Sequence, residues 1–133
     1  MQTPRLALAL VLVLGCAHAQ YAGWLHSGSL WVLTDAGGAA LPATASEAGF
    51  PLLVRLDRDW FDFRQAQAHG EDIRCATAAG APVPYQIEEW DAARGTASVW
   101  VRLPSLRGQT RQELRLCWGR PDAVSESSGR THN

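Results

Sequence analysis

Residues 70–75 (GEDIRC), 84–91 (PYQIEEWD) and 95–104 (GTASVWVRLP) decide the fold of this chain. Apolar side chains recur at every second position over most of each stretch, which is the two-residue repeat of a half-buried β-strand. Segments rich in Gly, Ala and Pro join them, at residues 78–82 and 91–95. The pattern therefore predicts three consecutive antiparallel strands.

The rest of the chain adds strands of the same kind. Residues 59–69 interrupt the strand pattern, and Phe61, Phe63 and Ala66 are spaced to anchor a single helical turn across one end of the fold. Short strands separated by turns are typical of all-β proteins. We predict a small antiparallel β-sandwich, jelly-roll-like, with strands at residues 29–34, 50–57, 73–77, 83–90, 96–103 and 112–118.

The fourth and fifth strands can be aligned by parity. One alignment places all their apolar side chains on a single face, as a sheet that covers a core requires. The predicted pairs are Ile87 with Val99, Tyr85 with Val101, and Val83 with Leu103.

The opposite face of the same two strands is a candidate ligand site. It carries Gln86, Glu88, Trp90, Trp100 and Arg102. Indole rings stack on the apolar faces of pyranose rings, and amide, carboxylate and guanidinium groups bind sugar hydroxyls. The pattern indicates a polysaccharide-binding surface. The alternative is that the two indoles only pack, beneath the loop at residues 35–49 or against a neighbouring domain.

Three aspartates lie close together after the second predicted strand. Asp57, Asp59 and Asp62 supply the hard oxygen ligands that calcium prefers, and Glu71 and Asp72 are possible additions. The spacing is not that of an EF-hand. Calcium is the one cofactor that the sequence suggests, and a solvated acidic turn is the alternative interpretation.

No catalytic arrangement is evident, and we predict that the protein is not an enzyme. Glu88 and Glu89 are adjacent, so strict alternation along a strand places them on opposite faces. His26 and His69 have no Cys or His at zinc-ligand spacing. Ser27 lacks the strand-turn-helix context of a nucleophile elbow.

The N-terminus resembles an export signal. Residues 1–5 carry one positive charge, and residues 6–15 form an apolar run too short to span a bilayer. Residues 17–19 (AHA) fit a signal peptidase site, so we expect residues 1–19 to be a signal peptide, cleaved before Gln20. The alternative is a lipoprotein lipidated at Cys16. Either way the protein is expected to be exported, to the periplasm, the cell surface or the medium.

Residues 20–120 then form the predicted β-sandwich domain, and no later segment is long and apolar enough to span a membrane. The polar, Ser-rich residues 121–133 read as a linker or a truncated tail, with a natural C-terminus as the alternative. All 12 basic residues are Arg, and cleavage would leave 11 of them against 13 acidic residues, a net charge of −2. Nucleic-acid binding is therefore not expected.

Two cysteines remain after cleavage. Cys75 alternates with Ile73 and is predicted to face the core, whereas Cys117 alternates with Arg115 and is predicted to face outward. Thiols on opposite faces rarely meet disulfide geometry, so we expect both to be free.

The chain also resembles a bacterial family catalogued as domain of unknown function 2341, from about Trp24 to Ala123. Members are exported or envelope-associated; the domain often precedes a laminin-G or concanavalin-A-like domain, and some members are fused to proton-channel proteins of biopolymer transport. The resemblance implies no activity. The chain departs from the family pattern at Cys75 and Cys117. The stretches that carry it are 50–56 (FPLLVRL), 61–63 (FDF), 65–66 (QA), 70–74 (GEDIR), 84–91 (PYQIEEWD), 95–97 (GTA), 100–101 (WV) with Pro104, and 118–119 (WG).

Taken together, the sequence predicts a non-catalytic module of a larger exported protein, which binds a polysaccharide or an envelope protein. The alternative is a structural or assembly domain of an envelope biopolymer-transport system. A downstream lectin-like domain is the neighbour that the family resemblance implies.

Overall fold

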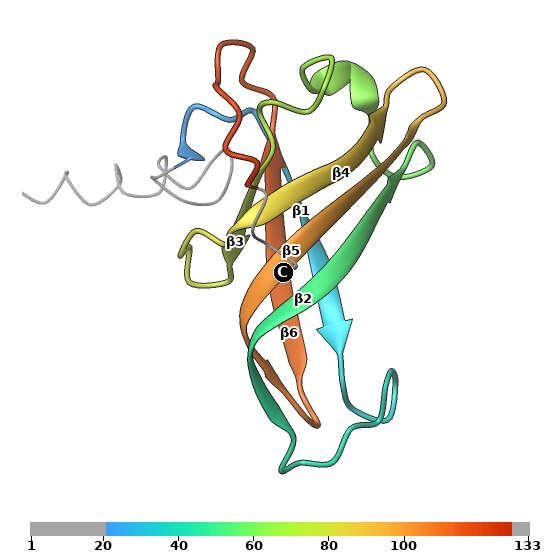
Figure 1. Cartoon of the computed structure of the whole chain (residues 1–133), viewed down its shortest axis with the longest axis vertical. Helices are drawn as coiled ribbons and strands as arrows, with labels where there is room; N and C mark the ends of the chain where they lie inside the picture. The colour runs from blue at the N-terminus through green and yellow to red at the C-terminus, as the bar shows by residue number, and fades with distance from the viewer. Residues whose placement is uncertain (1–20, 129–133) are drawn as a thin grey trace, which may run out of the picture.

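Two three-stranded antiparallel sheets face each other in this protein (Figure 1). The structure, a computed structural model, describes residues 21–128. One sheet has the order β1-β6-β3 and is called sheet A; the other has the order β2-β5-β4 and is called sheet B. The strands are β1 (His26–Leu33), β2 (Ser46–Asp57), β3 (Arg74–Thr77), β4 (Tyr85–Asp91), β5 (Thr96–Arg107) and β6 (Arg111–Trp118). The predicted all-β antiparallel sandwich is confirmed.

Two of the three predicted pairs of the β4–β5 hairpin are confirmed. The third is not, because Val83 lies before β4 and its N–H donates to the Cys75 carbonyl at 2.9 Å. Tyr85 pairs with Val101 and Ile87 with Val99, and these side chains point toward sheet A. Opposite them, β6 contributes the apolar residues of its own inner face, as the two-residue period requires. The core residues that are buried almost completely are Leu56, Phe61, Ile73, Cys75, Val99, Val101, Leu114 and Leu116.

The β2–β5 pair is longer than the sequence suggested. Strand β5 continues through Pro104 to Arg107, and β2 begins at Ser46, which pairs with Arg107. Proline cannot donate a backbone hydrogen bond, so it normally ends a central strand. Pro104 is tolerated because the β4 pairing ends at Tyr85, opposite Val101, before β5 reaches the proline.

The segment after β2 closes one end of the sandwich, as predicted. Residues Phe63–Gln65 form a single 3-10 turn, labelled η2, at the same end as the β4–β5 hairpin (Figure 1). Phe61 is fully buried, and its ring centroid lies 4.7 Å from that of Trp118 in β6. The two aromatic residues therefore join the closing segment to sheet A.

Both ends of the described chain lie against the sandwich. Tyr21 and Trp24 form a small second cluster with Ala76 and Cys117 on the outer side of sheet A. At the other end, the Ser128 N–H donates to the Tyr85 carbonyl at 2.8 Å. The expected signal peptide, its cleavage site and Cys16 lie outside the described residues, and the boundary at residue 120 stays a prediction.

Candidate functional site

The predicted ligand face is the outer surface of sheet B, and the structure places four of its five residues there. Trp100 is in the central strand β5, between Gln86 of β4 and Leu53 of β2. Its Nε1–H donates to Glu88 Oε1 at 2.5 Å. Arg102 lies two residues along β5, and its guanidinium donates to the Gly49 carbonyl at 2.8 Å. The face therefore has one half-buried indole with polar groups beside it.

Trp90 does not lie on this face, so that part of the prediction is wrong. A β-bulge between Ile87 and Glu89 adds one residue to β4, and Trp90 then pairs with Ala97, whose side chain faces the core. A bulge moves every later side chain to the opposite face.

The inward position of Trp90 is fixed by aromatic packing. Its ring meets Phe61 and Phe63 edge to face, with centroid distances of 5.9 and 5.3 Å. Gly70 lies against the other side of the ring. A Cβ at Gly70 would come within 2.5 Å of Trp90 Cε3, and the φ of Gly70 is +73°, so glycine is required there.

The bulge also overturns the argument that Glu88 and Glu89 face opposite sides. Glu88 reaches Trp100 on the outer face, and Glu89 pairs with Ser98, which alternates with Trp100 along β5. Both carboxylates are exposed. The two residues therefore share the outer face of sheet B.

One amide oxygen on this face lacks a hydrogen-bond donor among the described residues. Gln86 is half-buried, and its Oε1 is shielded from solvent without accepting a hydrogen bond from any residue between 21 and 128. A buried acceptor of this kind costs free energy until a donor reaches it.

The three aspartates do not converge into a metal site. Asp57 accepts a hydrogen bond from the Asp59 N–H at 2.9 Å, which forms a local turn. Asp62 caps η2 and pairs with Arg64 at 3.0 Å. The hydrogen bond from Arg64 lowers the pKa of the Asp62 carboxyl. Within residues 21–128 there is no group of three or more His, Cys, Asp or Glu side chains that could hold a metal ion.

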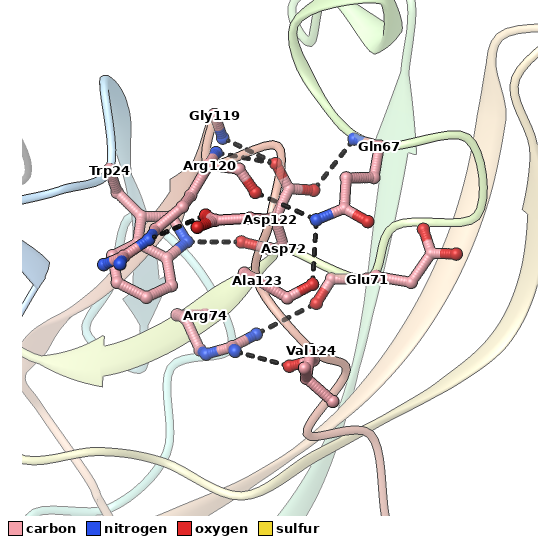
Figure 2. Close-up of polar contacts among 10 residues, drawn as sticks. All are labelled: Trp24, Gln67, Glu71, Asp72, Arg74, Gly119, Arg120, Asp122, Ala123 and Val124. Carbon is pink, nitrogen blue, oxygen red and sulfur yellow. Dashed lines mark hydrogen bonds and ion pairs between the residues drawn. The ribbon is translucent and has the colours of Figure 1, made fainter.

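The most elaborate polar arrangement among the described residues lies elsewhere, around Asp72 (Figure 2). We call it the buried polar centre, and its members are Asp72, Trp24 and Arg74. The Asp72 side chain is only 1% exposed. Its Oδ1 accepts from the Gln67 N–H, and its Oδ2 accepts from the N–H groups of Gly119 and Arg120, all at 2.9 Å. Three backbone donors satisfy this buried carboxylate, which ties the segment before β3 to the end of β6.

Trp24 is the second member of this buried polar centre. Its Nε1–H donates to the Asp72 carbonyl at 2.6 Å. The guanidinium groups of Arg74 and Arg120 lie 5.2 and 4.9 Å from its ring centroid, at cation–π distance. The indole therefore joins the N-terminal segment to the sandwich.

Arg74 is buried and acts as the third member. Its guanidinium donates to the Ile73 and Val124 carbonyls, both at 2.7 Å, and lies 3.5 Å from the Glu126 carboxylate. These contacts hold residues 124–126 against the domain (Figure 2 shows the bond to Val124). The GEDIR stretch was predicted to begin a strand and to carry the family resemblance, not to have this role. An acidic and a basic residue flanking Ile73 in a core strand were the available signal, because unpaired charges are rarely buried.

The cysteines differ from the prediction in one respect. Cys75 is a free thiol in the core, and burial raises its pKa to about 12. Cys117 is disulfide-bonded, and Cys75 is not its partner, so the expectation that Cys117 is free is wrong. Opposite faces exclude a bond between these two residues, but they place no limit on a bond to another part of the chain.

Comparisons with known proteins give one match. The profile of the family described as "Domain of unknown function (DUF2341)" matches residues 69–132, which include strands β3 to β6. The motifs at residues 50–56 and 61–66 precede the match. No curated protein and no solved structure matches the chain. From Tyr21 to Ser128, no helix has the length and apolar character needed to cross a membrane. Over residues 69–132, the chain is therefore similar to the family of this domain of unknown function.

Proposed function

We propose that this protein is a non-catalytic, exported module that binds glycans through the outer face of sheet B. The proposed binding residues are Gln86, Glu88, Trp100 and Arg102. The export signal expected at residues 1–19 supports the exported part of the proposal.

The orientation of Trp100 is the observation that carries the proposal. The hydrogen bond to Glu88 fixes the edge of the indole, and Gln86 and Leu53 flank it on the neighbouring strands. A platform held in one orientation loses less conformational entropy when a sugar ring stacks on it. The unsatisfied Gln86 Oε1 is close by, and a small rotation of the amide would offer it to a sugar hydroxyl.

Affinity electrophoresis of the full-length chain tests this proposal. The gels contain xylan, galactomannan, pullulan or alginate. We expect selective retardation in at least one gel, and we expect Trp100→Ala to weaken it about tenfold. Trp60→Ala is the matched control, because Trp60 is exposed in the turn after β2, outside the strands β4 and β5 that carry the proposed binding residues. Undiminished retardation of a folded Trp100→Ala variant rejects the face.

The same gels test the non-catalytic part. We expect no release of reducing ends from any retarded polysaccharide. Hydrolysis by the wild-type chain that disappears in Glu88→Gln would show instead that the two glutamates of the bulge act on the glycan.

A second candidate function is an assembly domain of an envelope system. The half-buried apolar residues of this face favour it, since Leu53 lies directly beside Trp100. A covering protein would also supply a donor to Gln86. This function predicts that oxidation of Trp100 by a water-soluble indole reagent is slower in intact cells than in the purified chain, relative to Trp60. Equal relative rates would contradict it.

A further inference from the structure

The outer face of sheet A carries the most exposed strand indole among the described residues. Trp31 lies in β1 and is 57% exposed. Its side chain points away from the core, because the neighbours Leu30 and Val32 pack against the core cluster. Trp31 was predicted only to be part of a strand.

A shallow hollow adjoins this indole. Trp31, Leu33 and Arg111 line it, and its volume is about 330 Å³. That volume is within the range of small-molecule sites in proteins. Leu33 supplies an apolar surface, and Arg111 supplies a guanidinium that is mostly exposed.

The polar groups around the hollow are held in place by one another. Arg111 Nε donates to Asp35 Oδ2 at 3.0 Å, and Asp35 Oδ1 also accepts from the Gly37 N–H at 3.0 Å. The hydrogen bond from Arg111 lowers the pKa of Asp35, so this carboxylate stays ionised. The Arg111 guanidinium is thus oriented by Asp35, and its exposed part faces solvent, where a ligand could reach it.

A second carboxylate held by a hydrogen bond lies beside Trp31, on the neighbouring strand β6. Glu113 pairs with Trp31 in the β1–β6 register. It accepts a hydrogen bond from the Ser29 hydroxyl and lies 3.5 Å from the Arg115 guanidinium. Two ion pairs, Arg111 with Asp35 and Arg115 with Glu113, therefore lie beside the indole, and their formal charges cancel.

We propose that Trp31, Arg111 and Glu113 form a second glycan subsite, specific for an uncharged pyranose. The exposed indole stacks on the apolar face of the ring, while the guanidinium and carboxylate bind its hydroxyls. The balanced charges favour a neutral sugar over a uronic acid. The ring of charged groups disfavours a large apolar protein partner, since interface cores are depleted in such groups. This inference rests on the proposed glycan-binding function and adds a site on the opposite sheet.

The test uses the same gels and the full-length chain. We expect Trp31→Ala to weaken retardation about tenfold in the neutral gels of xylan, galactomannan or pullulan, and Arg111→Gln to weaken it less. Trp60→Ala, with 48% of Trp60 exposed, again serves as the control. Circular dichroism confirms that each variant is folded, and Trp31 is exposed enough for its removal to leave the core intact.

The outcomes separate the two sites. Weaker retardation of Trp31→Ala supports the inference, whatever the result for Trp100→Ala. If Trp100→Ala is then retarded as strongly as the wild type, only the site on sheet B is rejected. Retardation of Trp31→Ala equal to that of the wild type overturns the inference, and a loss confined to Trp100→Ala leaves the proposed function standing. Retardation of the wild type only in the alginate gel also overturns the inference. If no polysaccharide retards the wild type, both sites are rejected.

Discussion

The buried polar centre and the outer face of sheet B are built from the same residue types, yet they do different things. Each combines an indole with arginine and carboxylate groups. At the centre, two guanidinium groups lie at cation–π distance from the Trp24 ring, and backbone donors satisfy the Asp72 carboxylate. On the face, Trp100 is half-buried and Glu88 is exposed. Burial, rather than composition, therefore distinguishes a residue set that holds the fold together from one that lies at the surface.

The largest effect should come from the saturated side of this comparison. In Asp72→Asn, one carboxylate oxygen becomes an NH₂ group that faces backbone N–H donors. We expect the free energy of unfolding to fall by about 3 kcal/mol, measured by urea denaturation. Asp122→Asn is the control, because Asp122 is exposed and pairs with Arg120 at the surface. Equal stability of the two variants would break the comparison.

The two tryptophans separated by the bulge provide the next test. Trp90→Ala removes a ring packed against Phe61 and Phe63, and we expect a loss of about 3 kcal/mol in the free energy of unfolding. Trp100→Ala should cost less than about 1 kcal/mol, because its ring is on the outer face. The measurement is again urea denaturation. Equal losses would mean that Trp100 is a core residue, and the glycan proposal would lose its platform.

The dependence of the free energy of unfolding on alkaline pH should reveal the ionisation of the buried Cys75 and Tyr85 side chains. Burial raises the pKa of Cys75 from 9.0 to about 12 and that of Tyr85 from 10.0 to about 12. Each group ionises first in the unfolded chain, so its stabilising contribution is complete below the unfolded pKa and is lost as the pH rises toward 12.

The matched variant for this measurement is Cys75→Ala. We expect the wild-type free energy of unfolding to decline from about pH 9, by about 1.4 kcal/mol per pH unit, and that of the variant only from about pH 10. The slopes between pH 9 and 10 are compared rather than the absolute stabilities. Superimposable slopes would show that Cys75 is not buried as a neutral thiol.

The smallest effect concerns the acidic turn, which is exposed yet locally satisfied. Since Asp62 pairs with Arg64 and the aspartates do not converge, millimolar calcium should leave the melting temperature unchanged within about 1 °C. Differential scanning fluorimetry with calcium and with chelator measures this. A rise of several degrees, abolished by Asp57→Asn, would restore the predicted calcium site.

The strand framework was predictable because side-chain alternation is a local signal. The pairs Ile87–Val99 and Tyr85–Val101 follow from it directly. The bulge was missed because a uniform period was extended through Glu88. The signal was present: Ile87 and Trp90 are three residues apart with two glutamates between them, and only an extra residue lets both apolar side chains reach the core.

The buried polar centre could not be predicted in the same way. Asp72 bonds to Gly119 and Arg120, 47 and 48 residues away, and these contacts exist only after both sheets have formed. The charged residues on either side of Ile73 indicate that hydrogen-bond partners are needed, but they do not identify those partners. Such long-range saturation depends on tertiary structure, which local periodicity does not encode.

Residues 124–128 have a consequence for the solubility of the protein. A lateral strand with open N–H and C=O groups is a template on which a second molecule can extend the sheet. In β4, the Ile87 N–H donates to Ser127 Oγ and the Tyr85 carbonyl accepts from the Ser128 N–H, while Arg74 anchors the segment at Val124. The segment thus covers part of the open edge of β4, and we expect a chain shortened to residue 120 to aggregate more readily than the full chain.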